Sequence, residues 1–242
     1  MNRYTLTAIL LVLTMISGAL AANPNLPHAG YLFPAGGQRG TTIQVTVGGQ
    51  KLKGAKAVLV SGKGVKAKLV RFIKPIFTNN KDMKEIRLRI RDCMVAKNPK
   101  AKKPGSKNKK PVERTPLPED HPFVLALKTL SIPALQDVNT RLSDPTRKLQ
   151  TKQAIAEELV LKFTIDRNAA PGPREVRILT KMGLSAPIRF FVGRNRDHVE
   201  PFWYYYKPSQ SKTLTLPVTI HGQLLPKQID RYTFHAKKGQ PL

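Results

Sequence analysis

The stretch LVLKFTI, Leu159–Ile165, limits most strongly what this chain can fold into. Apolar residues occupy every second position, and Lys162 and Thr164 are among the residues between them. In a β-strand, successive side chains point to opposite faces, so this alternation predicts a half-buried β-strand. Other short runs with strand-like patterns lie between turns rich in glycine or proline. These runs are Thr42–Val47, Ala57–Val60, Val65–Phe72, Glu175–Thr180 and Pro187–Val192.

The predicted strands favour two antiparallel sheets packed face to face, as in an immunoglobulin-like β-sandwich. Hydrophobic residues make up 40% of the 242 residues, which is enough for one or two modest cores. Cys93 is the only cysteine, so no intramolecular disulfide can form and the fold must depend on its core. We expect Cys93 itself to be a small, half-buried apolar side chain rather than a reactive thiol.

The predicted sandwich is divided into 22–73 and 159–193 by an insertion, 74–158. The insertion begins with an alternating stretch, Lys84–Met94, which predicts a strand. Apolar residues at helical spacing follow from Val124 to Leu130, so we expect the insertion to be helical over about 121–158. Two further short helices are predicted within that range, at Ala134–Leu142 and Thr146–Glu158.

Within the insertion, AKNPKAKKPGSKNKKP (Ala96–Pro111) contains seven lysines and no acidic residue. It has almost no apolar side chain to bury, and proline and glycine interrupt it, so we predict disorder over about 96–118. Its lysines are the candidate contacts for an anionic polymer: Lys97, Lys100, Lys102, Lys103, Lys107, Lys109 and Lys110. A solvated loop without a partner is the alternative interpretation. The segment contains no aromatic residue for base stacking, so we expect no specific nucleic-acid recognition.

The N-terminus has the pattern of a secretory signal peptide. Arg3 precedes the apolar run Ala8–Ile16, and the small residues of Ala19–Ala21 follow. We predict a signal peptide over 1–21, with cleavage between Ala21 and Ala22. No later run approaches the roughly 20 apolar residues of a transmembrane helix, so no anchor is expected after cleavage. The expected location is the periplasm, the cell surface or the extracellular space.

A second β-rich unit is expected after a proline-bracketed linker over 194–212. The aromatic cluster Phe202–Tyr206 in that linker is interpreted as packing against a neighbouring domain, with stacking on a sugar as the alternative. Alternation resumes from Leu214 to Ile220, and a further strand is predicted at Ile229–Ala236. Two strands cannot form a core, so 213–242 is expected to be the truncated start of a domain in a longer protein.

Several of these segments resemble known modules. PAGGQRGTTIQVTVGGQKLKGA is similar to the start of an IPT/TIG-type immunoglobulin-like domain, and AAPGPREVRILTKMGLSAPIRFFVG to its closing strands. LPVTIHGQLLPKQIDRYTFHAKKGQ resembles the opening of a bacterial pre-peptidase C-terminal (PPC) domain. The order resembles the N-terminal part of large exported bacterial proteins. It implies a non-catalytic binding, spacer or adhesion module whose partner is a protein or glycan at the cell surface.

No catalytic, metal or cofactor site is predicted. The five histidines lack metal-ligand spacing and are interpreted as solvated or loop residues. The glycines of Gly36–Gly40 lack the GK[ST] ending of a phosphate loop and are interpreted as turn residues. The pair Glu157-Glu158 is interpreted as the charged end of a helix. At Asp230, the carboxylate at the PPC-like position, we expect a turn or strand-end role, with calcium binding as the alternative.

Two alternatives to the binding, spacer or adhesion role stay open. The chain could be the ancillary N-terminal region of a secreted hydrolase or peptidase whose catalytic part lies outside these residues. The formal net charge of +27 also leaves open polyanion binding through the lysine-rich segment.

Overall fold

The strongest alternating run forms the strand that it predicts. The computed structural model describes residues 25–98, 113–144, 152–201, 213–224 and 229–240, and Leu159–Ile165 lies in β6 (Glu157–Ile165). The other predicted strands of the sandwich are confirmed as β3 (Thr42–Gln50), β4 (Ala57–Val60), β5 (Val65–Ile73), β7 (Gly172–Thr180) and β9 (Ile188–Gly193). The protein is mainly β in the described part of the chain.

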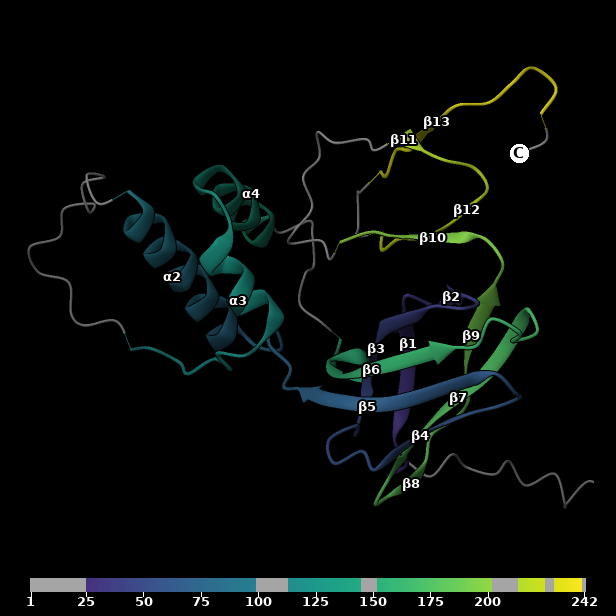
Figure 1. Cartoon of the computed structure of the whole chain (residues 1–242). Helices are drawn as coiled ribbons and strands as arrows, with labels where there is room; N and C mark the ends of the chain where they lie inside the picture. The colour runs from purple at the N-terminus through teal and green to yellow at the C-terminus, as the bar shows by residue number, and fades with distance from the viewer. Residues whose placement is uncertain (1–24, 99–112, 145–151, 202–212, 225–228, 241–242) are drawn as a thin grey trace, which may run out of the picture.

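These strands belong to two sheets (Figure 1). Sheet A has the order β1-β3-β6-β5, where β1 is His28–Phe33 and all neighbours are antiparallel. Sheet B has the order β2-β9-β7-β4, where β2 is Gly36–Gln38; the short β8 (Gly183–Leu184) also pairs with β7. Strand β2 runs parallel to β9, whereas the other pairs of sheet B are antiparallel.

The two sheets share one hydrophobic core. Leu161 and Phe163 of β6 are fully buried, as are Val176 of β7 and Phe190 of β9. The rings of Phe163 and Phe190 stack with centroids 4.5 Å apart, which joins the inner face of sheet A to that of sheet B. The alternation seen in the sequence thus separates a buried face from an exposed face in each sheet.

Strands β1 and β2 were not predicted, and β3 is longer than predicted. The Gly48-Gly49 pair was expected to end the strand, but β3 continues through it to Gln50. A Cβ atom on Gly48 would lie 1.8 Å from the ring of Tyr31, and one on Gly49 would lie 2.0 Å from the carbonyl oxygen of His28. These glycines therefore allow β1 to approach β3 closely and do not form a turn.

The strand predicted at Lys84–Met94 is wrong, because these residues lie in helix α2 (Asn80–Lys97). Ile86 and Ile90 are both fully buried, and their spacing of four residues matches one face of a helix. The side chain of Asn79 caps the helix by accepting a hydrogen bond from the backbone N–H of Asp82 (2.8 Å). The alternating pattern fits a strand as well, but the cap and the buried helical face favour the helix.

The insertion has a hydrophobic cluster of its own, beside the sandwich (Figure 1). Helices α3 (Pro122–Thr129) and α4 (Ile132–Ser143) pack against α2 and confirm two of the predicted helices. Buried residues of the cluster include Phe123, Leu127 and Leu135, together with Phe77 from the segment before α2. The rings of Phe77 and Phe123 meet edge to face, with centroids 4.8 Å apart.

The helix predicted at Thr146–Glu158 is wrong where the structure describes it. Only a short 3₁₀ turn, η1 (Gln153–Ile155), precedes β6, which begins at Glu157; residues 145–151 lie outside the described part. Glu157 accepts hydrogen bonds from the backbone N–H groups of Leu52 (2.6 Å) and Lys53 (3.1 Å). Glu158 accepts a hydrogen bond from the hydroxyl of Tyr31 (3.0 Å). The two glutamates therefore anchor the start of a strand and are not the end of a helix.

The predicted linker also contains a strand, β10 (Arg196–Val199). It pairs in parallel with β12 (Val218–His221), and β11 (Thr213–Leu214) pairs in parallel with β13 (Thr233–Phe234). The predicted signal peptide with Ala21 and Ala22, and the aromatic cluster 202–206, lie outside the described residues.

Candidate functional site

The lysine-rich segment begins on a defined helix. Lys97 is the last residue of α2 and is exposed, whereas Lys100, Lys102, Lys103, Lys107, Lys109 and Lys110 lie outside the described residues. The predicted disorder over 96–118 is wrong at both ends. Ala96 and Lys97 are helical, and residues 113–118 are described, with Leu117 buried in the helical cluster.

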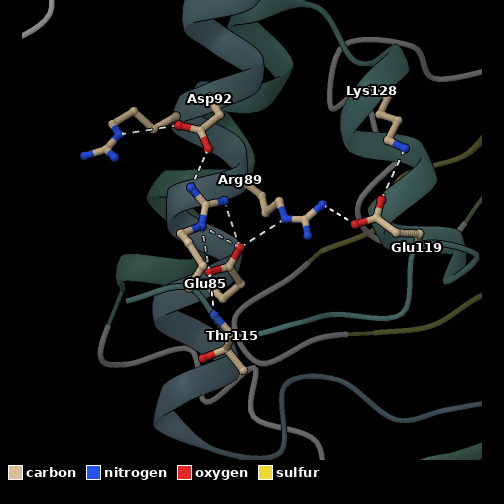
Figure 2. Close-up of polar contacts among 8 residues, drawn as sticks. Glu85, Arg89, Asp92, Thr115, Glu119 and Lys128 are labelled. Carbon is tan, nitrogen blue, oxygen red and sulfur yellow. Dashed lines mark hydrogen bonds and ion pairs between the residues drawn. The ribbon is translucent and has the colours of Figure 1, made fainter. Parts of the chain in front are cut away.

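The residues that follow the lysine-rich segment are held by a buried carboxylate on α2. This carboxylate is Glu85, whose side chain is 1% exposed. Arg114 donates from Nε to both carboxylate oxygens (3.0 Å each) and from Nη2 to Oε1 (2.8 Å). The backbone N–H of Thr115 donates to Oε2 (3.1 Å), and Arg89 Nε donates to Oε1 (3.0 Å) (Figure 2). Glu85 therefore joins the first residues after the segment to the helix before it.

Further ion pairs extend from the two arginines (Figure 2). Arg114 Nη1 donates to Asp92 (2.7 Å), one helical turn before the segment begins. Arg89 donates to Glu119, which also accepts a hydrogen bond from Lys128 Nζ on α3 (3.3 Å). We call these contacts among Glu85, Arg89, Asp92, Arg114, Thr115, Glu119 and Lys128 the anchor network.

The anchor network also lowers the pKa of two of its carboxyl groups, Glu85 and Glu119. Burial raises the pKa of Glu85, but hydrogen bonds from Arg114, Arg89 and Thr115 outweigh it and hold the pKa below its usual value. Hydrogen bonds from Arg89 and Lys128 likewise lower the pKa of Glu119. The hydrogen bonds from arginine and lysine therefore favour the ionised forms of Glu85 and Glu119.

His121 caps α3 in a part of the insertion that was predicted to contain only solvated or loop histidines. Its Nδ1 accepts a hydrogen bond from the backbone N–H of Phe123 (3.1 Å), which requires the neutral ring. Burial lowers the pKa of His121 to about 4, partly opposed by the charge of Asp120. His121 is therefore a structural residue that is sensitive to acid.

His221 is also not solvated. Its Nε2 lies 3.0 Å from Asp197 Oδ1, and both side chains are largely buried. Asp197 Oδ2 accepts a hydrogen bond from the backbone N–H of Gln38 (2.6 Å), at the end of β2. The pair therefore links β10 and β12 to sheet B, in a role that sequence spacing did not reveal.

Cys93 and Asp230 are two further residues that the sequence singled out. Cys93 is half-buried on α2, and burial raises the pKa of its thiol, which favours the unreactive form. Asp230 precedes β13 and is half-buried. Across the described residues, no group of three or more His, Cys, Asp or Glu side chains could hold a metal ion. No helix in the described ranges is long and apolar enough to cross a membrane.

Comparisons with known proteins add no relative. Neither the protein-family models nor the curated proteins nor the solved structures gave a match to this chain.

Proposed function

We propose that this chain is an exported, non-catalytic binding module in which an immunoglobulin-like sandwich presents a lysine-rich arm to an anionic polymer. The arm consists of residues 97–112, which contain the seven candidate lysines. The observation that carries the proposal is the anchor network, because Glu85 and Asp92 on the helix before the arm hold Arg114 just after it. A buried carboxylate with this many partners fixes both ends of the most basic stretch of the chain.

The strand order supports an immunoglobulin-like fold. The constant-type immunoglobulin domain places strands A, B, E and D in one sheet and C, F and G in the other. With β1, β3, β4, β5, β6, β7 and β9 as strands A to G, sheet A has the order A-B-E-D and sheet B contains G-F-C.

The helical insertion then lies between strands D and E, at one end of the sandwich. Ile73 of β5 pairs with Glu158 of β6, and Gly49 of β3 pairs with Glu157, so β5 and β3 both end where β6 begins. The connections β3–β4 and β7–β9 therefore lie at the same end as the insertion. In variable immunoglobulin domains, the B–C and F–G loops at this end bind the ligand. The insertion thus occupies a favourable position for a binding element.

An anionic polymer suits the arm because its charged groups are lysine ammonium ions. Seven lysines occur between Ala96 and Pro111 with no acid to neutralise them. The acids of the neighbouring anchor network are already paired with arginines. The arm has no aromatic side chain on which a base could stack, so backbone charge rather than base identity should determine binding.

Retention on heparin resin tests the arm. The test variant changes six lysines of the arm to glutamine, at positions Lys100, Lys102, Lys103, Lys107, Lys109 and Lys110. The matched control changes six exposed lysines outside the arm and outside the β3–β4 and β7–β9 connections, which are Lys63, Lys74, Lys81, Lys152, Lys237 and Lys238. Both variants lose the same net charge, so only the position of the charge differs between them.

We expect the arm variant to elute at clearly lower salt than the control variant, with an affinity for heparin at least about tenfold weaker. Equal losses of heparin affinity in the two variants would mean that net charge alone causes retention. The proposal would then be wrong. Unchanged melting temperatures show that both variants are folded.

Export is tested separately, by expressing the chain in bacteria and fractionating the cells. The expected product is extracytoplasmic and begins at Ala22 by mass spectrometry. A full-length product that stays in the cytoplasm would contradict this part of the proposal.

A further inference from the structure

The outer face of sheet A carries a second group of lysines, far from the arm in sequence. Lys66 and Lys68 of β5 and Lys162 of β6 are all exposed on this face. Lys68 lies directly opposite Lys162, and Lys66 lies opposite Thr164. The neighbouring positions of β3 are Thr42, opposite Thr164, and Gln44, opposite Lys162. We call these six residues the lysine face.

The lysine face has no internal compensation for its charge. Like charges directly opposite each other on neighbouring strands destabilise a sheet. None of the three lysine side chains forms an ion pair with any described residue, although acids in the insertion are paired repeatedly. The sandwich thus retains an unfavourable arrangement on a surface where neutral residues would be more stable.

Only one half of the outer face of sheet A is open. Thr46 of β3 and Val160 of β6 lie further along the same face and are buried, whereas Gln44 and Lys162 are exposed. Beside Val160, Arg71 of β5 donates to the backbone carbonyl of Asp120 in the insertion (3.1 Å). The open half therefore begins next to the point where the insertion contacts the sheet.

We propose that the lysine face is a docking surface for an anionic polysaccharide. The three lysines start from regularly spaced backbone positions, because neighbouring strands are about 4.8 Å apart and alternate residues of one strand are about 6.8 Å apart. Hydroxyl and amide groups of Thr42, Gln44 and Thr164 adjoin the lysines and can bond to sugar hydroxyls. Repeating acidic groups on a flexible chain match this combination of charge and neutral hydrogen-bonding groups.

Two other polyanions fit the lysine face less well. Single-stranded nucleic acids are bound by basic surfaces with stacking aromatics, and none of the six residues is aromatic. Anionic membranes are bound by surfaces that combine basic residues with inserted apolar or aromatic side chains, and the six residues include none of these. Val70, in the β-bulge of β5 after Lys68, is 54% exposed, so anionic vesicles are a competing probe in the test. This inference rests on the proposed function, because it specifies the anionic polymer as a polysaccharide. The residues that carry it lie outside the arm.

Direct binding to heparin tests the lysine face, with the full chain and its arm variant as the two backgrounds. In each background, Lys66, Lys68 and Lys162 are changed to glutamine together. The matched control changes the exposed Lys63, Lys237 and Lys238 to glutamine, because these lie outside the lysine face and outside the β3–β4 and β7–β9 connections and carry the same charge. Titration calorimetry measures heparin affinity, and oligo-dT and vesicles containing phosphatidylserine serve as the competing probes.

We expect the lysine-face substitutions to weaken heparin binding at least about fivefold in both backgrounds, and the control substitutions less than about twofold. Replacing the three lysines with arginine should restore most of the affinity. Equal effects of the two triple variants would overturn the proposal, as would an equal or larger loss of oligo-dT or vesicle binding. A loss only from the arm substitutions would overturn the lysine face and leave the proposed function intact. A loss of heparin affinity only from the lysine-face substitutions would overturn the proposed role of the arm and leave the lysine face intact.

Discussion

The sandwich and the helical insertion are stabilised in different ways. The core of the sandwich is apolar, and its largest fully buried side chains include Phe163 and Phe190. The insertion has a second apolar cluster, but it also buries the charged Glu85 and depends on the neutral ring of His121. Burial of apolar surface is nearly independent of pH, whereas ion pairs and a neutral histidine are not. The insertion should therefore respond to pH and salt, while the sandwich responds mainly to changes in packing.

The largest expected effect is in the core of the sandwich. Phe190→Ala should lower the free energy of unfolding by about 3 to 5 kcal/mol, because it opens a cavity beside Phe163. The neighbouring Phe191 is the matched control, since it lies on the same strand and is 49% exposed. Phe191→Ala should cost less than about 1 kcal/mol in urea denaturation. A similar decrease in the free energy of unfolding for Phe190→Ala and Phe191→Ala would contradict the assignment of the core.

The next effect is at the centre of the anchor network. Glu85→Gln should destabilise the insertion by about 3 kcal/mol, because Arg114 and Arg89 lose their buried partner. Glu119→Gln is the control, since Glu119 also pairs with Arg89 but is 56% exposed, and its replacement should destabilise the insertion much less than Glu85→Gln. Resolved amide signals of α2 and of β6 in NMR spectra should show that α2 is affected more. Equal changes in both elements would contradict separate stabilisation.

Acid should weaken the insertion before the sandwich. The pKa of His121 is about 4 in the folded chain, against 6.5 unfolded, so its stabilising effect is complete above about pH 6.5 and is lost as the pH falls toward 4. That shift corresponds to about 3 kcal/mol if the ring were fully buried, and we expect about 2 because it is partly exposed. The lowered pKa of Glu85 adds a further loss below its unfolded value of 4.5.

The sandwich should show the opposite tendency. Burial raises the pKa of Glu158, so its protonated form favours folding and acid does not remove stability there. His121→Asn keeps a capping side chain at α3 and should remove most of the loss between pH 6.5 and 4. Thermal unfolding at each pH, followed by NMR, measures both effects. A loss of β6 signals before those of α3 would contradict the account.

The smallest effect is on the outer face of sheet A. Lys68→Gln should raise the free energy of unfolding by a few tenths of a kcal/mol, because it removes the repulsion with Lys162. Lys181→Gln, in an exposed turn, is the control and should have almost no effect. The difference should disappear in high salt, where surface charges are screened. A loss of stability in Lys68→Gln would show that the lysine makes a favourable contact.

The strands of the sandwich were predictable because their alternation is local. The sequence from Leu159 to Ile165 shows directly which side chains face the core. Strand β3 was predicted too short because Gly48 and Gly49 resemble a turn, and only the approach of Tyr31 and His28 from β1 explains them. That contact joins residues far apart in the chain, which a local pattern does not contain.

Helix α2 and the anchor network were harder to predict, because local sequence patterns do not show contacts between distant residues. Ile86, Leu88 and Ile90 alternate like a strand, and the cap at Asn79 was the missed local signal for a helix. Glu85 and Arg114 are 29 residues apart, with the whole arm between them. Spacing cannot pair an acid with one of many basic residues in a chain of net charge +27. The arm was therefore recognisable in the sequence, but its anchoring was not.

Amide hydrogen exchange of the full chain, with and without heparin, tests the central claim most directly. The account predicts that heparin slows exchange at the end of α2, through the arm and at residues 113–115, and also in β5 and β6, with little change in sheet B. Protection confined to sheet B, or equally distributed over the chain, would contradict it.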